Sequence, residues 1–295
     1  MLSANEAQIV QKLNELEQRK GELPSFAKLY RELLCIQSKA KTGFMASRRG
    51  FHDSIISQAA IPDRLAQGSP LLSFSDLSLD WEQVKAVFQE VAAVVARDSP
   101  DSPGEIENLK NIASSSPLLQ RAVRDWYEGS SLASVAETSS VDKELLSFVV
   151  QAALKPFLSL HSEVLQPKVN QESWRRRYCP ICGGKPDFAY LDKERGERWL
   201  LCSRCDAEWL FLRLECPYCG TQNQDALAYF TDDEGLYRLY VCEQCHTYIK
   251  AVDLRRTESE VLLPLERVMT LDMDRQGQEK GYKPGYWLQS SVTWN

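Results

Sequence analysis

Hydrophobic residues recur three and four positions apart through the first 170 residues, which is the spacing of one face of an α-helix. Asp80 precedes one of these runs with a capping pattern typical of a helix start. The runs cover residues 4–20, about 24–42, 80–95, 105–114, 117–128, 130–138 and 141–165. The sequence therefore predicts an all-helical N-terminal domain over residues 1–170.

The pattern changes near Pro167, where glycines, aromatic residues and cysteines increase and hydrophobic positions begin to alternate. Alternation of this kind predicts β-hairpins that turn at residues 192–196 and 232–235. Each hairpin follows a Cys-Pro-x-Cys-Gly motif and precedes a Cys-x-x-Cys motif and an apolar strand, so the plan repeats after about 37 residues. We predict an α+β protein whose helical domain is followed by two small modules at 171–214 and 215–257, with a C-terminal helix and tail at 258–295.

Eight of the nine cysteines form four Cys-x-x-Cys pairs, a pattern that predicts metal binding. The two-residue gap lets both sulfurs of a pair face one ion, and two pairs complete a tetrahedral site. The internal repeat groups the ligands in chain order, with Cys179, Cys182, Cys202 and Cys205 in one site and Cys216, Cys219, Cys242 and Cys245 in the other. We expect two metal ions per chain, iron or zinc, and closed sites that stabilise small folds favour zinc.

The rest of the composition favours a cytoplasmic protein without catalytic function. The chain begins without a secretory signal and contains no apolar run that we expect to span a bilayer. Cysteine pairs in a reducing compartment are more typical of metal sites than of disulfides. No nucleophile motif, phosphate loop or paired carboxylates stand out, so we predict that the protein is not an enzyme. Cys35, on a predicted helix, is expected to be a buried thiol.

A basic and aromatic run, Trp174-Arg175-Arg176-Arg177-Tyr178, precedes the first cysteine pair. Such a run beside a zinc ribbon can bind nucleic acid, dock an acidic protein surface or form a solvated linker. The net charge of −6 and the acidic residues around the cysteine motifs argue against nucleic acid. Whether two copies form a homodimer stays open.

Several motifs resemble the formate dehydrogenase accessory protein FdhE family. They are Arg177-Tyr178-Cys179-Pro180-Ile181-Cys182-Gly183, Leu201-Cys202-Ser203-Arg204-Cys205-Asp206-Ala207-Glu208-Trp209, Cys216-Pro217-Tyr218-Cys219-Gly220 and Cys242-Glu243-Gln244-Cys245-His246-Thr247-Tyr248-Ile249-Lys250. The resemblance covers about residues 174–285, and it departs from the family at His246, where many relatives are expected to carry glycine.

The resemblance implies two rubredoxin-like modules and a cytoplasmic maturation factor that is required for active formate dehydrogenase. It also makes iron as strong a candidate metal as zinc. The implied partner is the catalytic subunit, a molybdenum or tungsten protein that is exported after its cofactor is loaded. Residues Trp174–Tyr178 are the expected contact with that partner. The alternatives are a zinc-ribbon regulator that binds nucleic acid and a rubredoxin-like electron carrier.

Overall fold

The chain divides into two compact units in a computed structural model that describes residues 3–47, 60–98 and 103–287. The first unit combines residues 1–55 with 74–160, and the second combines residues 56–73 with 161–295. The second unit thus takes a segment from the region predicted as one N-terminal domain, as well as residues 161–170. The predicted boundary at residue 170 does not coincide with this division.

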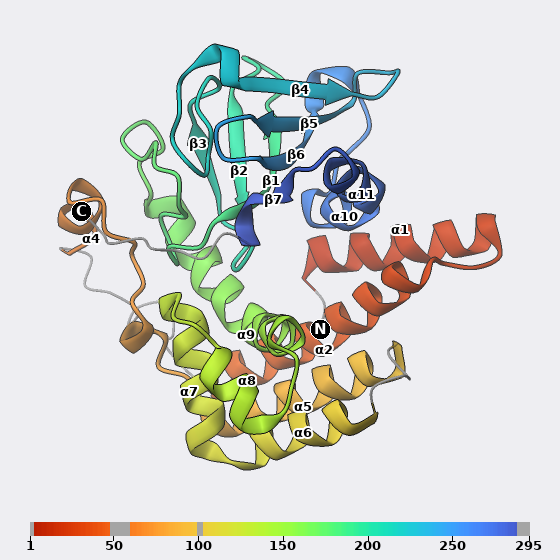
Figure 1. The fold of residues 1–295 in the computed structure, drawn as a ribbon, viewed down its shortest axis with the longest axis vertical. Coiled ribbons are helices and arrows are strands. Elements are labelled where there is room, and N and C mark those ends of the chain that lie inside the picture. The colour runs from red at the N-terminus through yellow and green to blue at the C-terminus, as the bar shows by residue number, and fades with distance from the viewer. Residues whose placement is uncertain (1–2, 48–59, 99–102, 288–295) are drawn as a thin grey trace. The chain divides into compact units, whose positions relative to one another are not determined.

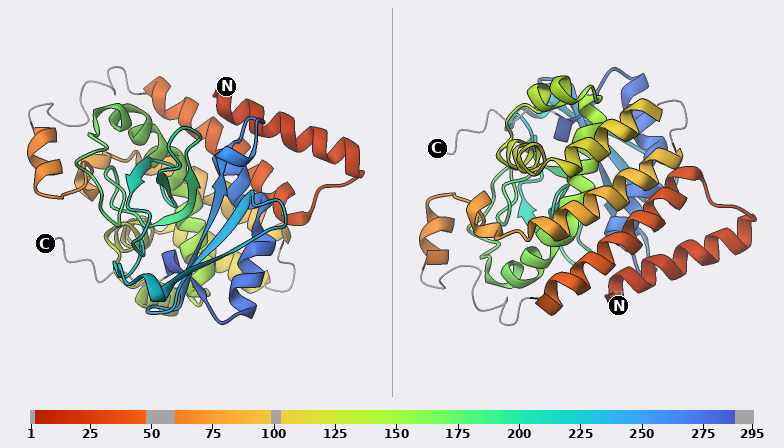
Figure 2. Two further views of the ribbon diagram at one scale, coloured as in Figure 1. Left: turned by 90° about the horizontal axis from the view of Figure 1, so that it is seen from above. Right: turned by 90° about the horizontal axis from the view of Figure 1, so that it is seen from below.

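The first unit is helical where the hydrophobic spacing predicts helices. Its elements are α1 (Ala4–Lys20), α2 (Ser25–Ser47), η1 (Phe74–Leu77), α5 (Trp81–Asp98), α6 (Pro103–Ser114), α7 (Ser116–Glu128), α8 (Ala133–Ser139) and α9 (Lys143–Leu165), whose end belongs to the second unit. Helices α2, α5 and α6 run side by side (Figure 2). Helix α2 continues past Gly43, where the sequence predicted its end, because glycine inside a helix costs only about 1 kcal/mol and tertiary packing offsets it.

Local side-chain contacts account for the helix ends. Ser3 and Glu6 form a capping box at the start of α1, and Gly21 ends that helix in the left-handed conformation. The Asp80 carboxylate accepts the backbone N–H groups of Glu82 at 3.1 Å and Gln83 at 3.3 Å at the start of α5. These caps satisfy backbone groups that have no partner inside the helix.

The core of the first unit packs apolar side chains from distant parts of the chain. Phe44 and Phe157 lie edge to face with ring centroids 5.4 Å apart. Cys35, predicted to be buried, is instead exposed, because it lies on α2 between the buried residues Leu34 and Ile36 and faces away from them. The segment 143–168 is long and apolar enough to cross a membrane by composition alone, but 72% of its apolar window is buried, as in the core helix of a soluble fold.

The second unit contains one sheet that joins both cysteine modules (Figure 1). Its strands are β1 (Pro186–Leu191), β2 (Arg198–Cys202), β3 (Glu208–Phe211), β4 (Leu227–Thr231), β5 (Tyr237–Cys242), β6 (Thr247–Asp253) and β7 (Lys283–Pro284). The order is β3-β2-β1-β6-β5-β4, with β7 paired to β6. Both predicted hairpins are present, as β1–β2 and β4–β5, and the apolar strands that follow them are β3 and β6.

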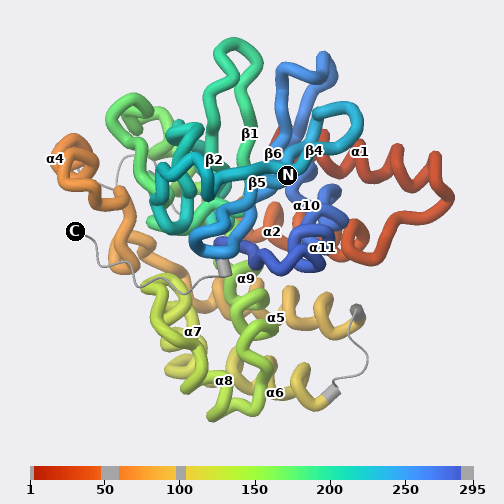
Figure 3. Tube along the Cα trace, turned by 45° about the horizontal axis from the view of Figure 1, so that its top comes forward, coloured from red at the N-terminus to blue at the C-terminus, as the bar shows by residue number. Residues whose placement is uncertain are grey.

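Parallel pairing of β1 with β6 makes the two modules one structure. Phe188 pairs with Lys250 and Leu191 with Asp253, so the innermost strand of each module is buried in the middle of the sheet. The path of the chain through this sheet is traced in Figure 3. The expected boundary at residue 214 therefore falls inside a continuous sheet.

A segment from the amino-terminal half of the chain belongs to this unit. After α4 (Ala60–Ala66), the backbone N–H groups of Leu71 and Leu72 each donate at 2.8 Å to carbonyls of the first knuckle, those of Pro180 and Ile181. The Tyr178 hydroxyl donates to the Gly68 carbonyl at 2.7 Å. The first cysteine motif is thus held by residues more than 100 positions earlier in the chain.

The C-terminal segment, defined here as residues 258–287, packs against the sheet and is not a free tail. It forms two short helices, α10 (Leu263–Met269) and α11 (Leu271–Glu279), where the sequence predicted a single helix near 264–273. The break falls at Thr270, whose hydroxyl donates to the Glu266 carbonyl at 2.7 Å. Met273 and Tyr282 cover an apolar cluster of Leu239, Val241 and Tyr248. Residues 288–295 of the predicted tail lie outside the described residues.

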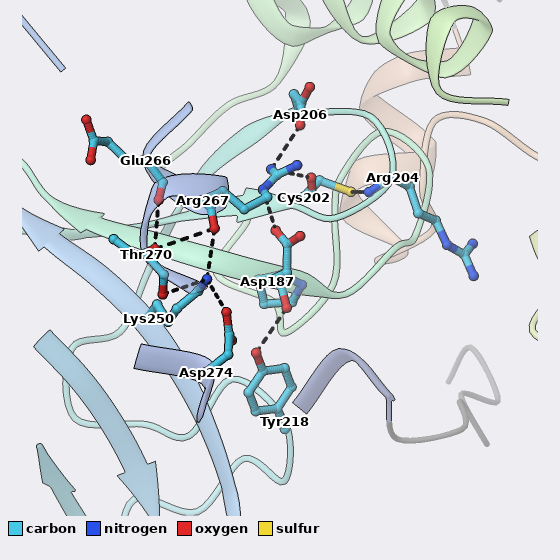
Figure 4. Close-up of polar contacts among 11 residues, drawn as sticks. Asp187, Cys202, Arg204, Asp206, Tyr218, Lys250, Glu266, Arg267, Thr270 and Asp274 are labelled. Carbon is cyan, nitrogen blue, oxygen red and sulfur yellow. Dashed lines mark hydrogen bonds and ion pairs between the residues drawn. The ribbon is translucent and has the colours of Figure 1, made fainter. Parts of the chain in front are cut away.

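A buried polar network fixes this segment to the middle of the sheet (Figure 4). The Lys250 ammonium on β6 is only 4% exposed; it forms an ion pair with Asp274 and donates to the Arg267 carbonyl at 2.8 Å. The Tyr248 hydroxyl donates to the other Asp274 oxygen at 2.8 Å. Burial lowers the pKa of Lys250, and Asp274 opposes that effect, so the carboxylate keeps the ammonium charged.

We predict that Asp274→Asn destabilises the second unit by about 3 kcal/mol or more, because it leaves the Lys250 charge buried without a counter-ion. Adding Lys250→Met removes the orphaned charge, so the double variant is expected to recover part of the loss. The measurement is the free energy of unfolding from denaturant titration. The single variant Lys250→Met completes the comparison. A loss in the double variant equal to the sum of the losses in the two single variants would contradict a direct coupling of the two residues.

Candidate metal centre

The first four-cysteine cluster brings together the knuckle before β1 and the turn between β2 and β3. Sulfur–sulfur distances are 3.6 Å for Cys179–Cys205, 3.5 Å for Cys182–Cys202 and 3.4 Å for Cys182–Cys205. All four sulfurs lie within 4.8 Å of one another, and all four residues are buried. This grouping is the one that the internal repeat predicts.

The second cluster repeats the arrangement between the knuckle before β4 and the turn between β5 and β6. Cys216 and Cys245 sulfurs are 3.7 Å apart, as are those of Cys219 and Cys242. Here Cys219 and Cys245 are only half buried, so the second cluster lies closer to solvent than the first. The cysteines in both clusters are free thiols, with no disulfide among the described residues.

The donor set fits a tetrahedral metal ion. Four sulfurs at about 2.3 Å from a zinc ion stand about 3.8 Å apart, close to the distances in both clusters. Burial raises the pKa of Cys179 and Cys205, and burial also raises the pKa of Cys242 to about 11. Against the effect of burial, hydrogen bonds from the neighbouring thiols lower the pKa of Cys182, so the first cluster by itself favours one thiolate and not four. A cation between the sulfurs would supply the charge that four thiolates require. Iron fits the same donors, so the geometry does not separate the two metals.

All four knuckles place the residue after their second cysteine in the left-handed conformation. Gly183 and Gly220 adopt φ of 70° and 78°, and Asp206 and His246 adopt φ of 57° and 51°. The turn directs backbone N–H groups at sulfur: that of Ile181 points at Cys179 and that of Arg204 at Cys202, at 3.3 and 3.4 Å. Such bonds stabilise metal-bound thiolates. His246, where glycine was expected, thus adopts the same left-handed turn as glycine does, at a steric cost of roughly 1–2 kcal/mol.

Positive charge surrounds the first cluster. Arg204 interacts electrostatically with Cys182, and its side chain packs against Gly184 beside the Cys202 sulfur. Burial and the nearby guanidinium groups of Arg204 and Arg177 lower the pKa of Lys185 to about 8. A divalent ion with four thiolates carries a formal charge of about −2, which these cations offset.

A buried cation, Arg198 from the first module, lies beside the second cluster. Its guanidinium lies over the Phe211 and Tyr240 rings at 5.2 and 5.8 Å and donates to the Leu212 and Glu215 carbonyls. Burial lowers the pKa of Arg198 to about 10, and no carboxylate in the described part of the chain pairs with it. A small cavity that it lines also reaches Cys216 and Cys242. Arg198 is therefore placed to offset the charge of an anionic metal centre in the neighbouring module.

Two further arginines tie the clusters to other elements. Arg267 of α10 lies 3.1 Å from Asp187 and 2.9 Å from Asp206, and it donates to the Cys202 carbonyl at 3.2 Å. Arg177 donates to the Tyr218 carbonyl in the second cluster's knuckle at 2.8 Å. Sequence reasoning missed Arg198 and Arg267, because nothing in the local pattern marks them as neighbours of the cysteines.

The basic and aromatic run is only partly on the surface. Trp174 is fully buried, and its ring N–H donates to the Tyr178 carbonyl at 3.0 Å. Arg176 lies over the Trp174 ring and against Gly68. Arg175 pairs with Glu172 at 2.7 Å, and only Arg177 is exposed. Trp174 thus supports the fold of the first module, while the arginines on either side of Arg176 face outward.

The fold and both clusters define a class of protein: a helical unit joined to two zinc-ribbon-like cysteine modules that share one sheet. Residues 178–213 match the family model described as FdhE, central domain. A protein named FdhE homolog from Aquifex aeolicus (strain VF5) is 28% identical over 261 residues, covering 83% of this chain and 86% of the other. Protein FdhE from Escherichia coli O127:H6 is 27% identical over 227 residues, covering 76% and 70%.

The fold agrees with a solved structure of the same name. The crystal structure of the FdhE protein from Pseudomonas aeruginosa superposes with a TM-score of 0.59 at 17% identity, over 98% of this chain and 96% of the other. The chain is similar to FdhE proteins over most of its length, and this similarity supports an accessory role for formate dehydrogenase.

We predict that Cys216→Ser lowers the metal content by about one ion per chain and makes residues 216–250 sensitive to protease, because a ribbon this small folds with its ion. The first unit, with its own core, is expected to stay helical. The measurements are elemental analysis and limited proteolysis. Cys35→Ser is the matched control, since Cys35 is exposed and outside both clusters; it is expected to keep both ions. Full metal content in Cys216→Ser would contradict the assignment.

Chelation is predicted to empty the two sites in order. The second site, with Cys219 and Cys245 half buried, is expected to lose its ion several times faster than the first, whose ligands are all buried. Native mass spectrometry during incubation with a chelator follows the one-ion and two-ion species. Comparison with Cys216→Ser assigns the faster phase. A single phase, or faster loss from the first site, would show that ligand burial does not control release.

Proposed function

We propose that the protein is a non-catalytic cytoplasmic accessory factor that binds the catalytic subunit of formate dehydrogenase during its maturation. Similarity to FdhE proteins carries this proposal. The eight clustered cysteines are the ligands of two metal ions, iron or zinc, which hold the second unit in shape. A pre-formed surface loses little entropy on binding, which suits recognition of an incompletely matured partner.

The outward-facing arginines remain the proposed contact in the Trp174–Tyr178 segment. Arg175 and Arg177 have accessible guanidinium groups, and guanidinium is a frequent contributor to protein interfaces. Trp174 acts by holding the segment in place, because its ring is buried. Tyr178 is half buried and bonded to Gly68, so it also positions the segment.

The contacts of the arginine run disfavour nucleic-acid binding. Arg176 is committed to Trp174 and Gly68, so it is not available to a phosphate backbone. Exposed acidic residues lie in the same unit, among them Asp225, Asp233 and Glu234. A phosphate backbone needs a continuous basic surface, which this arrangement interrupts.

We predict that deletion of the gene abolishes respiratory formate oxidation while the catalytic subunit is still synthesised. The protein is also expected to co-purify with that subunit from the cytoplasmic fraction. Formate-dependent dye reduction and immunoblotting measure the two effects. Arg175→Ala with Arg177→Ala is expected to weaken co-purification several-fold at unchanged metal content.

The matched control is Arg275→Ala, which removes an exposed arginine whose ion-pair partners among the described residues are Asp272 and Glu279, near it on α11. It is expected to bind like the wild type. Normal formate oxidation in the deletion strain would overturn the proposed function. Equal binding by the double variant and the control would remove only the arginine contact. A reversible one-electron signal from an iron-loaded protein that binds no subunit would favour the electron-carrier alternative.

A further inference from the structure

The two edge strands of the sheet in the second unit differ in whether their outward backbone groups have hydrogen-bond partners. At the β3 edge, the Gln166 side chain both donates to the Glu208 carbonyl and accepts its N–H, and the Gln171 side chain accepts the Leu210 N–H at 3.2 Å. Side-chain amides therefore satisfy the backbone groups that a further strand would use. Proteins close sheet edges in such ways to prevent unwanted pairing.

The opposite edge, β4, is open. In an antiparallel pair, the backbone N–H and C=O of one residue point toward the paired strand, and those of the next residue point away from it. Glu243 donates to the Ala226 carbonyl at 2.9 Å and Asp232 to the Tyr237 carbonyl at 3.3 Å, so the even-numbered residues between them face β5. Tyr229 and Thr231 consequently direct their N–H groups outward, and within the described residues nothing accepts from them. The Leu227 N–H is already bonded to Gln224.

The side chains of β4 add apolar surface on both faces of this edge. Tyr229 is 51% exposed and Phe230 is 41% exposed, although both are large aromatic residues. The strand Leu-Ala-Tyr-Phe-Thr contains no charge, no proline and no bulge, the usual features that protect an edge. Open backbone groups flanked by aromatic side chains are what an added strand requires.

The charges at the ends of β4 restrict what can pair with it. Asp225 precedes the strand, and Asp232, Asp233 and Glu234 follow it in an exposed turn. In an antiparallel pair of two copies, these acidic ends would face each other and repel. A partner segment with basic residues at its ends meets no such repulsion. The charges thus favour a different polypeptide over a second copy of this chain.

We propose that the outer edge of β4, with Tyr229 and Phe230, binds an extended, basic-flanked segment of the catalytic subunit as an additional strand of the sheet. The proposal rests on the proposed function for the identity of the partner. Main-chain hydrogen bonds at Tyr229 and Thr231 hold the segment, and the two aromatic side chains contact its side chains on opposite faces of the sheet. The arginine contact at Arg175 and Arg177 is a separate surface.

The test uses the full-length, metal-loaded protein and the catalytic subunit synthesised without its cofactor. Thr231→Pro removes an outward N–H and leaves the β5 ladder intact, while Tyr229→Lys places a charge on the edge. Both are expected to weaken binding at least tenfold. Leu271→Lys is the matched control, because Leu271 is 40% exposed at the start of α11 and does not belong to β4; it is expected to bind like the wild type. Circular dichroism and metal content check that each variant is folded. If Thr231→Pro misfolds, Tyr229→Lys alone tests the edge.

Hydrogen exchange provides the second readout. The Tyr229 and Thr231 amides are expected to exchange rapidly in the free protein and at least tenfold more slowly in the complex. Slow exchange in a free monomer means that residues of this chain cover the edge, and slow exchange in a free dimer means that a second copy does. Either result overturns the proposal.

The binding data separate this proposal from the proposed function. Wild-type binding that both β4 variants retain, without protection of the two amides, overturns the edge proposal alone. A wild type that does not bind the subunit overturns the proposed function and, with it, the identity of the strand's partner.

Discussion

Parallel pairing of β1 with β6 is the constraint on which the second unit depends. It joins strands that lie about 60 residues apart in the sequence and converts two cysteine modules into one sheet. The same pairing brings Arg198 of the first module beside Cys216 of the second. It also lets one C-terminal segment, through Arg267 and Lys250, reach both modules. A free-standing ribbon would have neither a shared core nor a neighbouring cation.

The sequence predicts the local elements well because each is encoded by neighbours in the chain. Cys-x-x-Cys spacing, the Gly183 and Gly220 turns and the alternating strands all act over a few residues, and the structure has them where predicted. The grouping of the cysteines follows from the repeat. Helix positions in the first unit follow from hydrophobic spacing, except that α2 continues through Gly43.

What the sequence does not predict is non-local. Nothing in residues 60–73 marks Leu71 and Leu72 as partners of the first knuckle, since their contribution is backbone N–H groups that every residue carries. The aromatic run illustrates a second limit: composition cannot distinguish an exposed tryptophan from a buried one, and Trp174 is buried. For Cys35 the error is the reverse: the sequence predicted a buried thiol and the residue is exposed, because a single position on an amphipathic helix can lie on either face.

The contrast between the two sheet edges connects the metal sites with recognition. The knuckle of Cys216 and Cys219 leads into β4, and the turn of Cys242 and Cys245 joins β5 to β6. The second cluster therefore lies at the end of the sheet where β4 begins, β5 ends and β6 begins. An ion there would order the chain that leads into β4. Without that ion the strand would be more flexible before binding. It would then lose more conformational entropy when it binds the partner, which disfavours the complex. Under the two proposals, the more solvent-accessible metal site lies on the sheet half that meets the partner, so we expect metal loading and partner binding to be thermodynamically linked through one half of the sheet.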